Sequence, residues 1–169
     1  MGTPTIPERI HAAAPSDYLE VITRAVFQAG LSWAAIAERW DAYREAFCDF
    51  DVPRVAAFNE GDFARLAHME GIIQSNRKIR ATVANAQTLL DLERLHGGFQ
   101  KYLRSFPSYE ALSADLRKRF KFLGEMSVWY FLFRVRESVP EFESWVKTIR
   151  GDHPRMREMV ELARTTEQS

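Results

Sequence analysis

Apolar side chains recur every three or four residues through most of this chain, and that spacing most limits what it can fold into. Nowhere do four or more residues alternate between apolar and polar in a context rich in β-forming residues. The pattern predicts an all-α domain with short connections. One apolar stripe lies on a helix expected over residues 33–48 and consists of Trp33, Ile36, Trp40, Tyr43 and Phe47.

Capping residues set the expected helix boundaries. Ser16 is the predicted N-cap of the first helix, and Asn59 can cap a later one. Ser75 is expected to start the longest helix, which the Gly97-Gly98 pair ends. Later helices are expected over residues 126–136, 142–149 and 154–165.

The chain divides into three expected segments. Residues 1–15, with Pro4, Pro7 and Pro15, are predicted to be an irregular lead-in. Residues 16–150 are predicted to form the helical domain, with a helical hairpin near 117–136. Residues 151–169 are predicted to form a C-terminal helix.

Composition limits the classes of protein to consider. The 169 residues fit one domain, and a hydrophobic content of 46% is enough for a proper core. The net charge is zero, so any nucleic-acid footprint must be local. One cysteine excludes an internal disulfide and fits a reducing cytoplasm. No apolar run approaches the ~20 residues of a membrane span, and residues 1–15 lack the features of a signal peptide. We expect a cytoplasmic monomer without a membrane partner.

The stretch Phe27-Gln28-Ala29-Gly30-Leu31-Ser32-Trp33 has the pattern of a helix–turn–helix corner. Gly30 can end the first helix, and Ser32 can cap the second. Trp33 then lies in the first turn of the second helix. Such a flat ring is either the wall of a pocket for a flat ligand or an anchor of the core, and composition alone favours the core.

A second stretch, residues 117–127, has the pattern of a helical hairpin that grips DNA. A basic helix end is followed by Gly124, which is expected to let the chain turn tightly, and by an apolar helix. The free N–H groups of that helix, in the turn with Met126 and Ser127, can face a phosphate. The basic side chains nearby are Arg117, Lys118, Arg119 and Lys121. The alternative is an ordinary hairpin with a solvated basic face.

A third group of charges lies at the start of the longest helix. Arg77, Lys78 and Arg80 oppose the helix dipole there. Contact with phosphates would explain them, and simple solubility is the alternative.

The order of these motifs resembles one known family. Gln28 to Trp33 is followed by Tyr43 to Phe47, Phe50 to Ala56, Gly71-Ile72-Ile73, Lys78-Ile79, Asn85-Ala86 and Phe120 to Gly124. Over roughly residues 16–142 the chain resembles the DNA-3-methyladenine glycosylase I (Tag) family of the helix-hairpin-helix DNA glycosylase superfamily.

This resemblance implies a glycosylase-like helical domain that binds double-stranded DNA with alkylated bases and excises a flipped purine without a cofactor. It implies that Trp33 stacks on a cationic base, and that Gln28, Phe27 and residue 25 line the base site. It further implies that the following residues contact DNA: Gly30, Leu31, Arg77, Lys78, Lys121, Gly124, Met126 and Ser127.

The chain departs from the resembled family in two places on the base side. Ala25 stands where the resemblance places a base-recognising glutamate, which removes an acceptor from the pocket. The family's N-terminal segment, with a cysteine, a Tyr-His pair and Glu-Trp-Gly, is also missing. These differences favour a second hypothesis, a catalytically silent or retargeted DNA-binding module. A third, a helical protein-interaction domain, rests only on the zero net charge.

The same resemblance also bears on metal binding and on acid–base catalysis. The family's C-terminal zinc histidine falls at Phe142, and the four histidines and Cys48 are scattered. We therefore predict no structural zinc, with packing of Phe142 in its place. Glu141 lies where many superfamily members carry a catalytic carboxylate. Its alternative role is a helix-start acid stabilised by the dipole.

Overall fold

The computed structural model describes residues 9–28 and 33–149, together with Arg157, Val160, Glu161, Arg164 and Thr165; for Trp33 and Ala34 it describes the backbone alone. All regular elements in these ranges are helical, which confirms the predicted all-α class. The helices are α1 (Pro15–Gln28), α2 (Trp33–Glu38), α3 (Trp40–Ala46), the 3-10 helix η1 (Cys48–Phe50), α4 (Val52–Ala56), α5 (Glu60–Ala67), α6 (Asn76–His96), α7 (Phe99–Leu103), α8 (Tyr109–Arg119), α9 (Glu125–Arg134) and α10 (Phe142–Val146).

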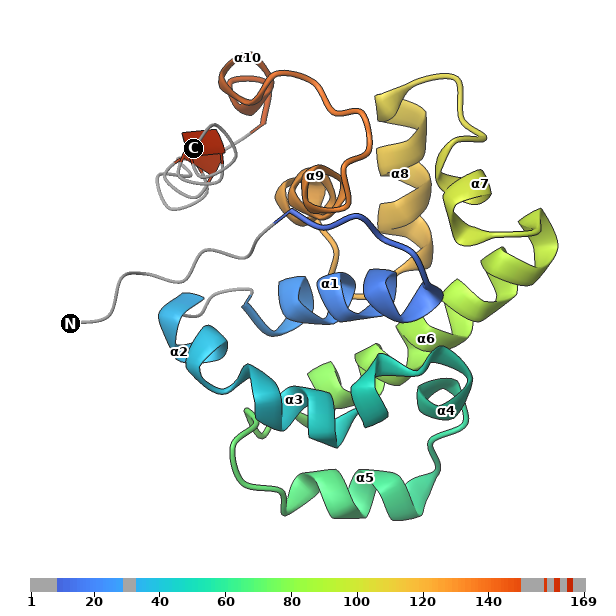
Figure 1. Ribbon diagram of the computed structural model, residues 1–169, viewed down its shortest axis with the longest axis vertical. Coiled ribbons are helices and arrows are strands. Elements are labelled where there is room, and N and C mark those ends of the chain that lie inside the picture. Colours follow the sequence, from blue (N-terminus) through green and yellow to red (C-terminus); the bar gives the residue numbers. More distant parts are fainter. Residues whose placement is uncertain (1–8, 29–32, 150–156, 158–159, 162–163, 166–169) are drawn as a thin grey trace.

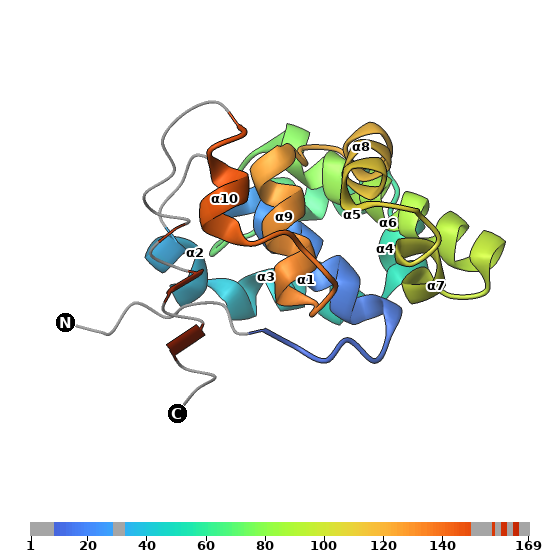
Figure 2. The same ribbon diagram turned by 90° about the horizontal axis from the view of Figure 1, so that it is seen from above.

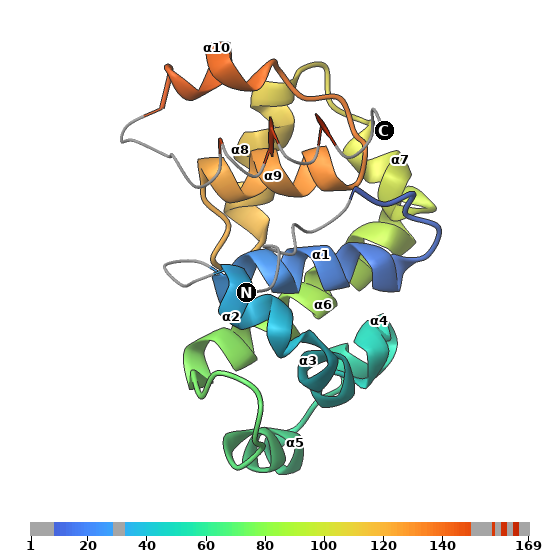
Figure 3. The same ribbon diagram turned by 60° about the vertical axis from the view of Figure 1, so that its left-hand side comes forward.

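Helix α1 runs through the middle of the molecule. It lies between the α8–α9 pair on one side and the α3–α5 segment on the other, and it also packs against α6 (Figures 1 and 3). Its apolar stripe is fully buried, with Leu19, Ile22 and Val26 all at 0% exposure. The inner face of α1 is therefore a central packing surface, with contacts to α2, α4, α6, α9 and η1.

Several predicted caps are confirmed. Asn59 and Asp62 form a reciprocal capping box at the start of α5. The Ser75 side chain accepts from the backbone N–H of Lys78 at the start of α6. At the other end of α6, Gly97 adopts the left-handed conformation, with φ of 72°.

The first helices differ from the prediction. Helix α1 begins at Pro15, not after a Ser16 cap, because the Asp17 carboxylate accepts from the backbone N–H groups of Ala13 and Ala14 and fixes the entry to the helix. The single helix expected over 33–48 is two helices that meet at Arg39, where φ is −107° and ψ is 9°. The break does not alter the stripe, since Trp40 remains buried.

The last helices are shorter than expected. Helix α9 ends at Arg134 because Arg136 adopts a φ of 62° and the backbone N–H of Glu137 returns to the carbonyl of Leu132. These bonds form a Schellman-type end without a glycine. Helix α10 covers only residues 142–146 of the expected 142–149, and most of the helix expected over 154–165 lies outside the described residues.

Helix α9 is buried on two sides. One side faces the main core, while the other belongs to a second apolar cluster with α10, which lies beside it (Figure 2). In that cluster Trp129 stacks on Phe133 at 5.1 Å and donates to the carbonyl of Pro140 at 3.1 Å. The described end of the predicted lead-in also joins α9, since the N–H of Ile10 donates to the carbonyl of Arg134 at 2.8 Å.

None of the helices in the described part of the chain combines the length and the apolar character needed to cross a bilayer.

The turn between α8 and α9 is fixed to α6 by one side chain. Asn85 is 1% exposed, and its amide oxygen accepts from the backbone N–H of Lys121 at 2.7 Å. Its amide nitrogen donates to the carbonyl of the same Lys121 at 3.2 Å. A buried amide is thus paired on both sides with one residue of the turn, which fixes the hairpin on the long helix.

Replacement of Asn85 by Ala is expected to lower the free energy of unfolding by about 1–3 kcal/mol, because two backbone groups of Lys121 lose their partner. Urea denaturation monitored by circular dichroism measures the change. The matched control is Gln87→Ala, which removes one bond from an exposed side chain to the carbonyl of Ala56 and is expected to cost less than about 0.5 kcal/mol. Equal losses in both variants would show that the Asn85 bonds are no stronger than surface bonds.

Candidate nucleic-acid interface and base site

The N-terminus of α9 is open to an incoming anion. Gly124 is its N-cap, no side chain caps it, and a Cβ added at Gly124 would meet nothing within 4 Å. The first backbone N–H groups of α9, in the turn with the half-buried Met126 and Ser127, are therefore without a side-chain acceptor. Such a helix end favours a phosphate.

The prediction that Gly124 makes the tight turn through its backbone freedom is wrong. Gly124 is extended, with φ of −98° and ψ of −175°, a conformation that any residue adopts. The left-handed residue is instead Phe122, with φ of 62°. The guanidinium of Arg77 lies 5.5 Å from the Phe122 ring centroid and joins the start of α6 to the turn. Gly124 thus supplies space for a close approach, and Phe122 supplies the bend.

Ion pairs separate the basic residues near this turn into two groups. Arg80 pairs with Glu60 at 3.3 Å, Arg117 with Glu125 at 3.6 Å and Arg119 with Asp115 at 2.7 Å. Arg77, Lys118 and Lys121 are exposed and have no carboxylate partner among the described residues. Their charges remain available to a phosphate.

Lys78 has a different environment from Arg77. Its ammonium lies 3.5 Å from the carbonyl of Phe27, one of the last carbonyls of α1, and burial lowers its pKa. A cation at the C-terminal end of a helix stabilises the exposed carbonyls. Lys78 therefore connects the start of α6 to the end of α1, beside the predicted DNA contacts.

On the base side, the last residues of α1 are buried. Ala25 is 8% exposed, Phe27 0% and Gln28 5%. The Phe27 ring packs edge-on against Tyr43 at 4.8 Å, which places it in the core. Gln28 differs, because both polar atoms of its amide are buried and have no hydrogen-bond partner in the described chain.

Three other predicted site residues are only partly described. Trp33 begins α2, but its side chain lies outside the described part. Gly30 and Leu31 lie outside the described residues altogether. The stacking role of Trp33 and the contact of Leu31 with the duplex remain predictions.

The structure contains a polar cluster beside Gln28 that was not predicted from the sequence. Arg24 lies one turn earlier on α1, with its guanidinium 5.0 Å from the Trp40 ring centroid and its Nε buried and unpaired. Burial, followed by the nearby charge of Arg134, lowers the pKa of Arg24 to about 10. Arg134 and Tyr130 of α9 are themselves buried. An arginine on a helix is ordinarily expected to be solvent-exposed. The one feature of the sequence that could have pointed to Arg24 as a site residue was its position one turn before Gln28.

Glu141 is the N-cap of α10. Its carboxylate accepts from the backbone N–H of Glu143 at 3.2 Å and of Ser144 at 2.9 Å, and from the Ser144 hydroxyl at 2.7 Å. The Ser144 hydroxyl bond is the main cause that lowers the pKa of Glu141, which is fully exposed. The position matches the alternative role as a helix-start acid, and a catalytic role remains a prediction.

The position expected to replace a zinc ligand is apolar. Phe142 is 1% exposed and lies 5.0 Å from the Trp129 ring. No group of three or more His, Cys, Asp or Glu side chains in the described ranges is arranged to hold a metal ion. These residues do not fit a structural zinc, and we assign no step to a metal.

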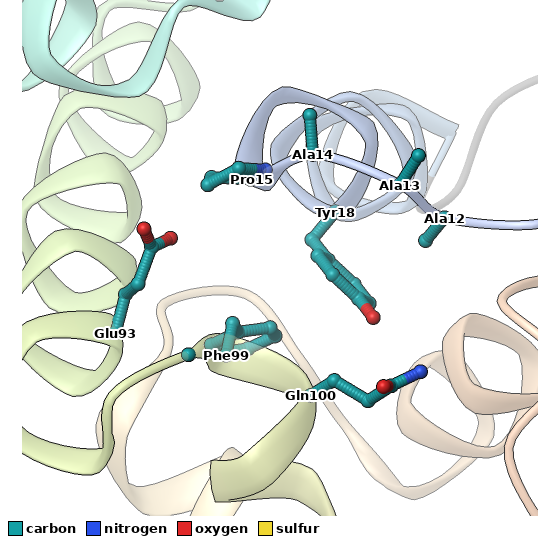
Figure 4. A pocket seen from close by; sticks show the side chains of 9 residues that line it. Ala12, Ala13, Ala14, Pro15, Tyr18, Glu93, Phe99 and Gln100 are labelled. Carbon is teal, nitrogen blue, oxygen red and sulfur yellow. The ribbon is translucent and has the colours of Figure 1, made fainter.

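A pocket lies at the other end of α1. It has a volume of about 260 Å³ and is lined by residues 12–15 with Tyr18, Glu93 and Phe99 (Figure 4). Helix α1 has 14 residues, so this pocket lies about 15–20 Å along the helix from Gln28. It is not the predicted base site.

Replacement of Ser144 by Ala is expected to raise the pKa of Glu141 toward its usual value, because the hydroxyl bond that favours the ionised form is lost. The pKa in the folded state is lowered, so the capping contribution is present above the ordinary pKa and is lost as the pH falls through the folded value. Carboxyl-carbon chemical shifts followed against pH measure the change, with Ser138→Ala as control. An unchanged titration in Ser144→Ala would contradict the capping geometry.

The chain was compared with known proteins. It matches the family described as methyladenine glycosylase over residues 12–118. It is 33% identical to DNA-3-methyladenine glycosylase 1 of Escherichia coli (strain K12), over 62% of this chain and 67% of that protein. It is 30% identical to DNA-3-methyladenine glycosylase of Haemophilus influenzae (strain ATCC 51907 / DSM 11121 / KW20 / Rd), over 62% and 68%.

A solved structure gives the same result. The fold is similar to that of 3-methyladenine DNA glycosylase I (TAG) from Staphylococcus aureus, with a TM-score of 0.67 and 29% identity over 76% of this chain and 79% of that one. The resemblance and the glycosylase-like fold predicted from the sequence are thereby confirmed. The chain belongs to the methyladenine glycosylase family.

Proposed function

We propose that this chain is a base-excision repair DNA glycosylase that hydrolyses the N-glycosidic bond of a damaged purine flipped out of duplex DNA. The relatives are named as 3-methyladenine glycosylases, so an alkylated purine is the first substrate class to test. The observation that supports DNA binding best is the end of the molecule where Gly124, Arg77 and Lys121 meet. An open helix N-terminus lies there beside a turn fixed by Asn85, with two cations that have no carboxylate partner in the described part of the chain.

Cleavage of the N-glycosidic bond of an alkylated base needs little chemical assistance from the protein. The C1′–N bond breaks with its electron pair going to the base, while a water oxygen bonds to C1′ and releases a proton. A purine that is alkylated on N3 or N7 is cationic in the nucleoside and therefore leaves as a neutral molecule. The protein then needs to extrude the base, hold it and admit water. We propose that Trp33 stacks on the base and that the chain acts in the cytoplasm as a monomer.

Replacement of Trp33 by Ala is expected to lower the rate of base release by about 100-fold, because stacking contributes ~1–3 kcal/mol for each base. Chromatography of free bases released from methylated duplex DNA measures the rate, and circular dichroism checks the fold. Trp33→Phe keeps a flat ring and is expected to retain most of the activity. Unchanged release from Trp33→Ala would show that the base does not bind against this residue.

Replacement of Lys121 by Glu is expected to weaken binding of duplex DNA of any sequence and to reduce the slope of log affinity against log salt by about 1. Fluorescence anisotropy at several salt concentrations measures both quantities. The matched control is Lys101→Glu on α7, an exposed lysine outside the turn between α8 and α9. Equal effects from both variants would indicate that only the overall charge matters, and no effect from either would favour the protein-interaction alternative.

One observation supports a second candidate, a retargeted or catalytically silent DNA-binding module. Ala25 is buried where the resembled family carries its base-recognising glutamate, so that position offers neither a charge nor an acceptor. Measurable DNA binding without release of any base would support the silent form, while release of a base other than 3-methyladenine would support retargeting.

A further inference from the structure

Three polar side chains on α1, Thr23, Arg24 and Gln28, have hydrogen-bonding groups that nothing in the described chain satisfies. Gln28 is only 5% exposed, and neither its amide nitrogen nor its amide oxygen has a hydrogen-bond partner among the described residues. One turn earlier the Nε of Arg24 is also buried and unpaired. Buried polar atoms in native proteins are nearly always paired. The amide of Gln28 and the Nε of Arg24 lie one turn apart on the same face of α1, and together they indicate a place for a ligand.

The internal contacts of Arg24 do not account for this unpaired donor. Its guanidinium lies over the Trp40 ring, which a cation favours but which offers no acceptor to Nε. Glu20, one turn earlier, is the nearby acid, but its Oε1 already accepts from the Trp40 indole and from the Nε of Arg44, both at 2.9 Å. The contact with Trp40 fixes the position of Arg24 and leaves its donor available.

Neighbouring groups act on the charge of Arg24 in both directions. Arg134 of α9 is 6% exposed and lies close enough for its charge to act on Arg24. Arg44 acts in the same direction, while Glu20 and Tyr130 act in the opposite one. With a pKa of about 10, Arg24 remains protonated near neutral pH. Ala25, beside it on the helix, contributes no negative charge.

The guanidinium of Arg24 disfavours a cationic base and favours a neutral base that carries a carbonyl oxygen. A cationic methylated adenine would meet the partly buried guanidinium of Arg24, and Glu20, the acid that acts on Arg24, already pairs with Arg44. A neutral base with a lactam edge, a carbonyl next to a ring N–H, pairs with the Gln28 amide through two hydrogen bonds. The remaining lone pair of its carbonyl oxygen can accept from the Nε of Arg24.

The same guanidinium also suits the departure of a neutral base. When the C1′–N bond breaks, the electron pair goes to a base that was uncharged, and the negative charge spreads onto its carbonyl oxygen. Water bonds to C1′ and gives up a proton, and the base is finally protonated on its ring nitrogen. A fixed cation at the carbonyl oxygen stabilises the charge as it develops. A cationic alkylated base, which leaves as a neutral molecule, gains nothing from that cation.

We propose that Arg24 and Gln28 form the base-reading wall of this glycosylase, and that it selects a neutral base with a lactam edge over a cationic alkylated adenine. This substrate class rests on the proposed glycosylase function. Arg24 is assigned to the leaving carbonyl oxygen, and Gln28 to the lactam edge.

The test compares two substrates under single-turnover conditions, a duplex with one hypoxanthine and a methylated duplex that contains 3-methyladenine. Free bases are quantified by chromatography after correction for spontaneous loss. The unmodified protein is expected to release hypoxanthine at least ~10-fold faster than 3-methyladenine. Arg24→Met keeps an apolar stem on Trp40 but removes the charge, and it is expected to lower hypoxanthine release by about 100-fold without lowering 3-methyladenine release. Arg24→Lys should retain part of the hypoxanthine activity.

The matched control is Arg65→Met, since Arg65 also lies over an aromatic ring, at 5.6 Å from Phe58, but is exposed and remote on α5. It should change neither rate. Circular dichroism confirms that each variant folds. Binding to a duplex with 2′-fluoro-deoxyinosine, which resists cleavage, gives a second readout that does not need catalysis.

The outcomes separate the two proposals. Faster release of 3-methyladenine, unaffected by Arg24→Met, would overturn the lactam preference and leave the glycosylase function in place. No release of either base, with Arg24-dependent preference for the 2′-fluoro-deoxyinosine duplex, would support the base-reading wall and overturn catalysis. No release and no such preference would overturn both.

Discussion

The two hydrogen bonds between Asn85 and Lys121 connect the parts of this protein that any DNA-binding role needs together. Asn85 lies in the middle of α6, the longest helix, and Lys121 lies in the turn before α9. Because a side-chain amide pairs with both backbone groups of one residue, the turn has one position on α6. This connection holds the exposed N-terminus of α9 and the Phe122 bend beside Arg77 of α6.

The base side of the molecule differs from the turn in how its buried polar groups are paired. At the turn, buried polar groups are paired, whereas along α1 the amide of Gln28 and the Nε of Arg24 are buried without partners. An unsatisfied group weakens the folded state, so it persists where a ligand completes it. The main core, with fully buried residues such as Leu19, Phe47 and Leu66, supplies the stability that tolerates these groups.

Much of the fold could be predicted from the sequence, because local signals agreed with tertiary packing. The helical spacing identified the class, and Asn59, Ser75 and Gly97 marked real helix ends. The end of α9 was missed because Arg136 adopts a left-handed conformation that no local residue preference announces. The hairpin was found by its pattern, but the bend was assigned to Gly124, since glycine is the usual residue there and Phe122 is not.

The candidate site was less predictable, because its decisive features depend on which atoms are left unpaired. The sequence marked Gln28 by resemblance and the basic residues by clustering, but it could not separate Arg77 and Lys121 from neighbours held in ion pairs. It gave no sign that Arg24 is held against Trp40. Helix α9 adds a consequence for how such a protein can diverge. Residues 128–134 are all buried, so nearly every substitution there disturbs a core, and the helix end that would meet a phosphate uses backbone groups. A change of base specificity in this architecture would therefore fall on the few side chains beside the base and would leave the backbone groups at the start of α9 as they are.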